Sequence, residues 1–110
     1  MAKYEKSFKG NFDLVLKLLD DEIIESAVSM ECVDSSDYCI GDINVSIRVY
    51  DKHFYRNGNR ASLNLTLIGK EDDLFVCAIG SGGGSGVFFN FSWGAEESMT
   101  SLVEKILEDY

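Results

Sequence analysis

The region spanning residues 61–93 constrains the fold most, because apolar residues recur there with the two-residue period of β-strands. Leu63, Leu65 and Leu67 alternate with polar residues, which is typical of a strand with one face in water. Residues 74–79 then form an unbroken apolar run, LFVCAI, which favours a strand covered on both faces near the centre of a sheet. We therefore expect an antiparallel sheet to form the core.

A third strand is expected at 87–93, after the glycine-rich loop. Phe89, Phe91 and Trp93 occupy alternate positions there and so fall on one face of the expected strand. Each such ring buries about 150–250 Å² in a folded protein. These three residues are therefore expected to anchor the core and, in one interpretation, to line an apolar ligand cavity between the sheet and the last helix.

The ends of the chain predict one further strand and two helices. A short strand fits residues 3–9, and apolar residues at helical spacing after a capping Asn11 predict a helix over 12–25. After Gly94, apolar residues at 99, 102, 103, 106, 107 and 110 form the stripe of a final amphipathic helix. The expected fold is a single α+β domain over 1–110: an antiparallel sheet of five to six strands with two helices packed on one face, in the order β-α-β-β-β-β-β-α.

The middle of the chain predicts hairpins. Residues 27–33 alternate as a strand, the sequence DSSD at 34–37 is typical of a turn, and such a turn would place Cys32 opposite Cys39. A bulge or break near Gly41 then leads into a strand that ends at Arg56. Asn57-Gly58 indicates a second hairpin, and a three-residue loop through Asn59 would pair Val49 with Leu67, which keeps apolar residues on one face.

Charge and cysteine content exclude several classes of function. The formal net charge of −9 disfavours generic DNA binding and binding to anionic membranes. No apolar run approaches the length of a membrane span, and the first residues lack the apolar segment of a secretory signal, so we expect a cytoplasmic protein. Three cysteines without CxxC spacing argue against a disulfide framework and a zinc site, and free thiols are expected.

Sequence motifs predict no active site. The glycine-rich loop at 81–86 leads into an expected strand instead of a helix and lacks the Lys-Ser/Thr ending of a phosphate-binding loop. His53 is the only histidine, so a histidine pair cannot form and a catalytic triad would depend on this residue alone. We expect no catalytic residue, no metal site and no cofactor, and a protein that is not an enzyme.

The sharpest local pattern lies on the expected long hairpin. Alternation places basic and aromatic residues on one face of it, namely Arg48, Tyr50, Lys52, Phe54, Arg56 and, on the neighbouring strand, Arg60. In an acidic chain such a ladder is a candidate face for an acidic protein partner, for instance the acidic C-terminal half of a second copy. The alternative is a solvated sheet face on which the basic side chains pack over the rings.

Three segments carry a resemblance to a known family: FKGNFD at 8–13, RVYDKHFYRNGNRASLNLTLIG at 48–69 and DDLFVCAIGSGGG at 72–84. Over nearly its full length the chain resembles a family of small bacterial proteins classed as a domain of unknown function. The resemblance implies a lone cytoplasmic domain and assigns no activity. In element order the chain is also similar to the TATA-binding-protein-like and helix-grip folds, although fold does not fix function.

These observations lead to two main hypotheses about function, besides a third in which His53 and the ladder residues form the site of an enzyme. The first is a non-enzymatic binding or protein-interaction module that self-associates as a homodimer, because two helices are too few to cover strands that are apolar on both faces. The second is a binder of a small apolar ligand, of helix-grip type, with Phe89, Phe91 and Trp93 lining the cavity.

Overall fold

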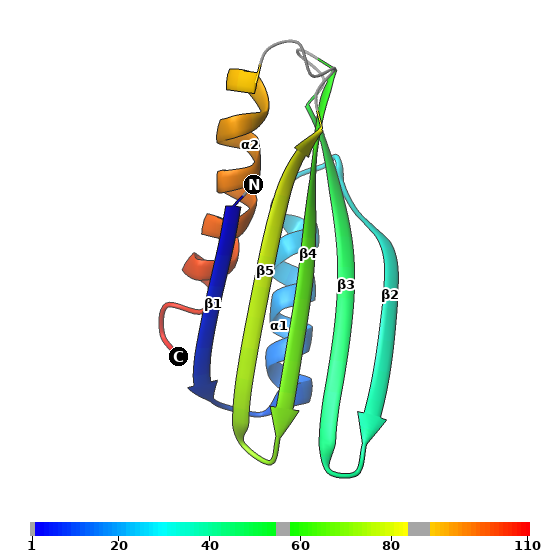
Figure 1. The fold of residues 1–110 in the computed structure, drawn as a ribbon, viewed down its shortest axis with the longest axis vertical. Helices are drawn as coiled ribbons and strands as arrows, with labels where there is room; N and C mark the ends of the chain where they lie inside the picture. Colours follow the sequence, from blue (N-terminus) through cyan, green and yellow to red (C-terminus); the bar gives the residue numbers. More distant parts are fainter. Residues whose placement is uncertain (1, 55–57, 84–88) are drawn as a thin grey trace.

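The computed structural model describes residues 2–54, 58–83 and 89–110, with the side chains at 54, 59, 83 and 89–97 outside that description. Its elements are β1 (Ala2–Lys9), α1 (Phe12–Glu25), β2 (Met30–Ile40), β3 (Ile43–Phe54), β4 (Asn59–Lys70), β5 (Asp73–Gly83) and α2 (Phe89–Ile106) (Figure 1).

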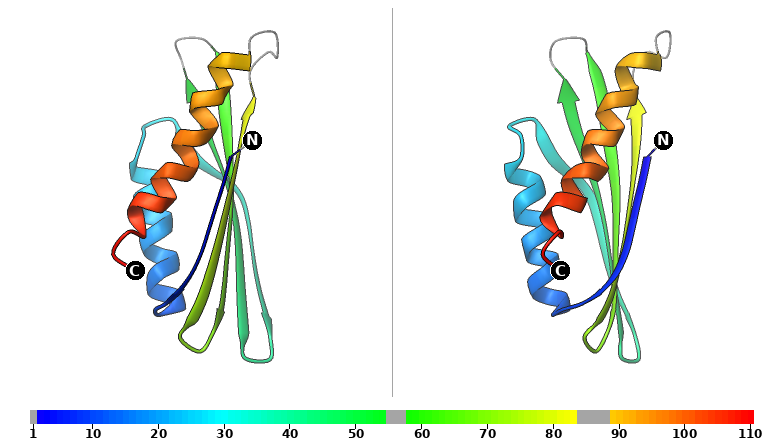
Figure 2. Two further views of the ribbon diagram at one scale, coloured as in Figure 1. Left: turned by 60° about the vertical axis from the view of Figure 1, so that its left-hand side comes forward. Right: turned by 90° about the vertical axis from the view of Figure 1, so that its left-hand side faces the viewer.

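The strands form one antiparallel sheet in the order β1-β5-β4-β3-β2. β2 to β5 follow one another as hairpins, and β1 pairs with β5 at the opposite edge from β2. Both helices lie on the same side of this sheet (Figure 2). The structure therefore confirms the predicted class, an α+β fold with an antiparallel sheet and two helices.

The core lies between the helices and the sheet face that they cover, which we call the inner face. α1 places Val15, Leu19 and Ile23 on it at helical spacing. Other buried side chains come from alternate positions of the strands and from the last turns of α2, and they include Tyr50, Leu63, Leu65, Leu67, Leu74, Val76, Ala78, Met99, Val103 and Leu107. Burial of apolar area on this face supplies the main driving force for folding.

Helix α1 begins and ends where the sequence predicts. The Asn11 side chain accepts a hydrogen bond from the Leu14 amide at 3.0 Å, as an N-cap does. At the other end the Ser26 hydroxyl donates to the Ile23 carbonyl at 2.6 Å. At each end of the helix, a side chain therefore pairs with one of the backbone groups that the helix itself leaves free.

The strand predicted at 87–93 is wrong over 89–93, because α2 begins at Phe89, while residues 87 and 88 lie outside the described residues. The sheet consequently has five strands, and the element order is β-α-β-β-β-β-α. Alternation over seven residues does not distinguish a strand from the first turns of a helix. The four-residue spacing that continues backwards from Met99 through Ala95 to Phe91 is the signal for a helix here.

The turn predicted at 34–37 is also wrong, since these residues lie inside β2. The chain reverses at Gly41 instead, where a φ of 60° suits glycine. Cys32 and Cys39 lie on the same strand, opposite Tyr50 and Asn44 of β3, and are not adjacent. The break predicted near Gly41 is confirmed as this turn between β2 and β3, and β2 has a separate register shift between Cys32 and Asp34 that was not predicted.

The second hairpin forms, but not in the predicted register. Phe54 pairs with Asn59, and Val49 pairs with Asn64 instead of Leu67. The prediction assumed that all alternating apolar residues of β3 and β4 share one covered face. In the structure those of β4 face the helices and those of β3 face away, so the sheet is apolar on both sides.

Candidate interaction surface

The outer face of the sheet, the one turned away from α1 and α2, is not covered by either helix (Figure 2). In Figure 1 it is the near face, with α1 behind the strands. Because side chains alternate between the faces of a strand, the register decides which of them lie on this surface.

Outer-face side chains form four rows that cross the sheet from β1 to β2. The rows are numbered from the upper end in Figure 1, and each is given in the strand order β1, β5, β4, β3, β2. The first row is Lys3, Ile79, Asn64, Val49 and Asp34, and the second is Glu5, Cys77, Thr66, Ile47 and Ser36. The third row is Ser7, Phe75, Ile68, Val45 and Tyr38, and the fourth is Lys9, Asp73, Lys70, Ile43 and Ile40. Every row carries a large apolar side chain, and the third is apolar at all positions but one.

Solvent reaches this surface. Tyr38 and Ile40 are 63% and 59% exposed at the β2 edge, while Ile47 and Ile79 are 37% and 36% exposed nearer the middle. Their neighbours, such as Phe75, are half-buried by one another. A contiguous apolar surface of this kind marks an interaction site far more often than scattered exposed residues do.

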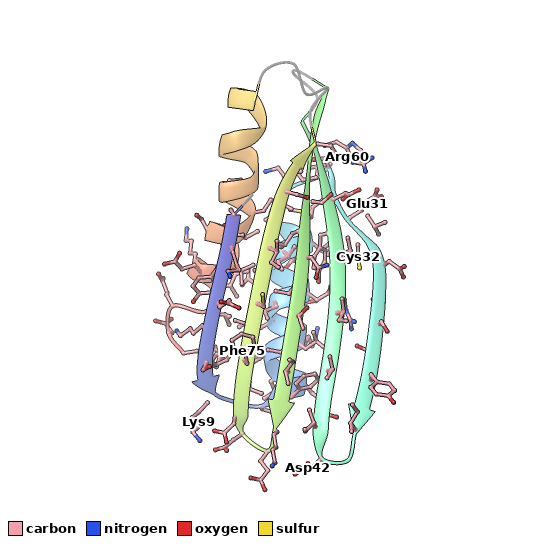
Figure 3. The ribbon with its side chains drawn as sticks, viewed as in Figure 1. Lys9, Glu31, Cys32, Asp42, Arg60 and Phe75 are labelled. Carbon is pink, nitrogen blue, oxygen red and sulfur yellow. The ribbon has the colours of Figure 1, made fainter. Side chains whose placement is uncertain are left out.

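A shallow groove of about 560 Å³ opens where the lower end of this surface meets the β1 edge. Its apolar walls include Ile43, Ile68 and Phe75, and its polar rim includes Lys70 and Asp73. Figure 3 shows Phe75 on the lower half of β5, above the turn that carries the chain from β4 into β5. The groove therefore belongs to the third and fourth rows.

A polar cluster borders the first row at the upper end of the outer face. The carboxylate of Asp51, which is buried, accepts a hydrogen bond from the Ser62 hydroxyl at 2.6 Å and lies 3.4 Å from the Nε of Arg60. Glu31 of β2 pairs with Asp51 of β3, and Figure 3 shows Glu31 and Arg60 at this end of the sheet. The surface is thus polar at its upper end and most apolar in the third row, while the fourth row combines Ile43 and Ile40 with the charged Lys9, Asp73 and Lys70.

Charges on the outer face nearly balance, in contrast to the chain as a whole with its net charge of −9. Among the described strand residues facing outwards, the cations are Lys3, Lys9, Arg60 and Lys70, and the anions are Glu5, Glu31, Asp34, Asp51 and Asp73. Most of the excess negative charge is therefore carried elsewhere on the molecule, so that this face presents little net charge to another acidic chain.

The predicted ladder of basic and aromatic residues is divided between the two faces. Arg48, Tyr50 and Lys52 alternate on the inner face, whereas Arg60 lies on the outer face opposite His53. The side chain of Phe54 and the whole of Arg56 lie outside the described residues. The prediction that these residues share one face was wrong because it shifted β4 relative to β3 by an odd number of residues from the observed register.

On the inner face the ladder residues take part in internal hydrogen bonds. The Tyr50 phenol is buried and donates to Asp20 of α1 at 2.6 Å, and burial, followed by this bond, raises the pKa of Tyr50. Arg48 donates to Asp37 of β2 at 2.9 Å, and this guanidinium, together with the Ser46 hydroxyl, lowers the pKa of the Asp37 carboxyl. These contacts tie α1 and β2 to β3.

The three aromatic residues predicted to line a ligand cavity, Phe89, Phe91 and Trp93, lie in the first two turns of α2, and their side chains are outside the described residues. Further along this helix, Met99 and Val103 are buried against the sheet. In its described part α2 therefore contributes to the packed core.

Side chains with reactive chemistry are dispersed. His53 is exposed at the upper end of β3, and Cys77 lies on the outer face, where partial burial, followed by the nearby Glu5, raises the pKa of its thiol. Within residues 2–54, 58–83 and 89–110, no group of three or more His, Cys, Asp or Glu side chains is arranged to hold a metal ion. The apolar outer face is thus the most distinctive surface of the described chain.

Comparisons with known proteins identify the family. In the described part of the chain no helix combines the length and the apolar character that crossing a membrane requires. Neither the curated proteins nor the solved structures yielded a match to the sequence. The model of a family of unknown function, DUF6054, matches residues 1–110, and the chain therefore belongs to that family.

Proposed function

We propose that this protein is a non-enzymatic protein-interaction module that binds a second copy of itself through the outer face of its sheet. The observation that carries the proposal is the combination of apolar side chains and near-neutral charge on a sheet face that the helices leave uncovered. A face of this composition loses unfavourable contact with water when another apolar face covers it.

The size of the face supports this partner. Five strands about 4.8 Å apart, with about 11 residues of about 3.3 Å each, give a face of about 870 Å². A stable protein interface buries about 800 Å² on each partner. One copy of the sheet is therefore large enough to form a standard dimer interface with another.

Charge also favours contact between two outer faces over contact between two β2 edges. β2 is an edge strand, but Glu31, Asp34 and Asp37 are exposed along it, and two such edges would repel each other. The outer face does not carry this penalty, because its cations and anions nearly balance. Three free cysteines agree with the reducing cytoplasm in which we place this function.

Sedimentation velocity on single variants tests the proposal. Ile47→Asp places a charge in the second row, on the strand next to the middle one, and is expected to convert the dimer into a monomer, because burying an unpaired carboxylate is costly. Ile79→Asp, on the neighbouring part of the face, is expected to do the same. Both positions are partly exposed in the single chain, so the folded monomer tolerates the charge.

Leu14→Asp is the matched control. Leu14 is a 67% exposed aliphatic residue on α1, on the opposite side of the molecule, and the substitution changes the net charge equally. The control is expected to remain dimeric. If all three variants sediment like the wild type, with circular dichroism showing folded protein, the outer face is not the interface and the proposal fails.

A further inference from the structure

We infer that the free edge of β2 binds an extended basic segment of another protein, which joins the sheet as an additional antiparallel strand. The backbone of β2 lies in the plane of the sheet, so its edge stays open whether or not a second copy covers the outer face. The inference therefore does not depend on the proposed dimer. Unpaired backbone groups, acidic side chains and a groove beside the edge carry it.

The hairpin between β2 and β3 determines which backbone groups of β2 face outwards. Ile40 pairs with Ile43 across a two-residue turn, so these two residues exchange both backbone hydrogen bonds. Because bonded and non-bonded pairs alternate along a hairpin, Ser35, Asp37 and Cys39 turn their amides and carbonyls away from β3. In the described part of the chain no strand lies beyond β2 to receive them (Figure 1).

Side-chain contacts agree with this alternation. Paired side chains lie closest in non-bonded pairs. The Ser46 hydroxyl donates to Asp37 at 2.7 Å, and the Cys39 thiol donates to Asn44 at 2.9 Å. The Ser35 amide, which is turned away from β3, donates to the carboxylate of the preceding residue at 2.8 Å. The edge thus presents backbone groups that an added strand can pair with.

The opposite edge of the sheet is protected. β1 carries Lys3, Lys6 and Lys9, and lysine is a common guard of edge strands. The Lys6 ammonium also donates to the Leu107 carbonyl at 2.9 Å, which places the C-terminal segment beside β1 (Figure 1). Residues 34–40 of β2, in contrast, pair regularly with β3, are all exposed and include neither lysine nor proline. β2 is therefore the edge that is open to a partner.

Charge selects a basic partner. The charged side chains of β2 are all acidic, namely Glu31, Asp34 and Asp37. Asp37 accepts hydrogen bonds from Ser46 and Arg48 through the same oxygen, Oδ1, and its side chain is still 66% exposed. Among the described residues no hydrogen-bond donor reaches its other oxygen, Oδ2. A donor from an added strand can bind there.

A groove of about 250 Å³ between β2 and the start of α1 fits a basic side chain. Its apolar wall includes Phe12 and Leu16, and its carboxylates are Asp13 and Asp37, with no basic side chain among the residues that line it. A residue paired directly with Asp37 projects on the same face of the sheet. A lysine or arginine there lays its stem along the apolar wall and its charge near the carboxylates. The next residues of the added strand lie on the outer face beside the exposed Tyr38, where apolar side chains fit.

Fluorescence anisotropy with a labelled synthetic peptide, acetyl-Thr-Lys-Val-Arg-Val-Lys-Thr-amide, tests the inference. The peptide is basic on one face and apolar on the other, and saturable binding that weakens with added salt is expected. The same peptide with glutamate at every basic position is the control and is expected not to bind. N-methylation of the arginine removes an amide that faces β2 and should abolish binding, whereas N-methylation of a valine, whose amide faces away, should be tolerated.

Variants of the protein locate the site. Asp37→Lys and Asp13→Lys are each expected to raise the Kd of the peptide roughly five- to thirty-fold, because each replaces an attraction by a repulsion. Asp109→Lys, at an exposed position near the other edge of the sheet, is the matched control and should bind like the wild type. Circular dichroism checks that each variant is folded. Ile47→Asp should also bind normally, since its side chain lies on the outer face.

Several results would overturn the inference. They are no binding of the basic peptide, equal binding of the glutamate peptide, equal binding after N-methylation of the arginine, or equal binding by Asp37→Lys and Asp13→Lys. Growth of the protein into open chains that do not bind the peptide would assign the β2 edge to the lysine-bearing β1 of another copy, and would overturn it too. The effect of Ile47→Asp on the dimer is measured separately, so the proposed function can fail while this inference stands, and the reverse.

Discussion

Replacing Tyr50 by phenylalanine tests how the inner face joins α1 to β3. The ring is buried and its hydroxyl donates to Asp20 at 2.6 Å, so the substitution keeps the packing and removes one hydrogen bond to a charged acceptor. Such a bond contributes about 1.5–3 kcal/mol. Asp20 is half-buried and water replaces part of the bond, so we expect a loss of about 1.5–2 kcal/mol in the free energy of unfolding at pH 7.

The pH dependence identifies the bond. The pKa of Tyr50 is raised above its ordinary value of 10.0 in the folded protein. The hydroxyl of Tyr50 therefore makes its full contribution to the free energy of unfolding below pH 10, and this contribution is lost as the pH rises further. The advantage of the wild type over Tyr50→Phe should narrow by about 1.4 kcal/mol per pH unit above pH 10. Urea unfolding at fixed protein concentration from pH 7 to pH 11.5 measures this. An advantage near zero at pH 7, or one that stays constant to pH 11.5, would refute the reasoning.

Three further substitutions probe other parts of the fold. Asn11→Ala removes the N-cap of α1 and should lower the free energy of unfolding by about 1 kcal/mol in a urea titration. Gly69→Ala places a Cβ 2.8 Å from side-chain carbons of Phe12 and Leu74, and this overpacking should cost about 1–3 kcal/mol, seen as a lower thermal midpoint. Asp37 has a lowered pKa in the folded protein, so the small advantage of the wild type over Asp37→Asn, at most about 1 kcal/mol for so exposed a pair, should exist at pH 7 and vanish as the pH falls below 3.8.

Local patterns in the sequence predicted much of this fold. Helix α1 and its cap followed from the spacing after Asn11, and the class followed from strands and helices whose periods are clear over ten or more residues. The prediction of a strand at 87–93 was wrong because seven residues fit both the strand period and the helix period. Only the longer four-residue spacing through Ala95 to Val103 favours the helix. The strand register failed because it depends on which face of each strand is covered, and that is a property of the assembled sheet.

The candidate surface shows the same limit. The alternation of Ile43, Val45, Ile47 and Val49 predicted an apolar face of β3, but the sequence prediction placed this face in the core beside the leucines of β4. In the structure that face is the outer one. The sequence did indicate more apolar strand faces than two helices can cover. This excess led to the expectation of self-association, although it did not identify which face of the sheet is uncovered.

The mass of the native protein in solution tests the central claim most directly. Gentle native mass spectrometry over a range of micromolar concentrations should give a species of twice the 12.3 kDa chain mass, without additional mass, if a second copy covers the outer face as we propose. A species of the chain mass alone at every concentration would contradict the claim. A monomer that carries extra mass, lost on unfolding, would also contradict it and would favour a bound apolar ligand instead.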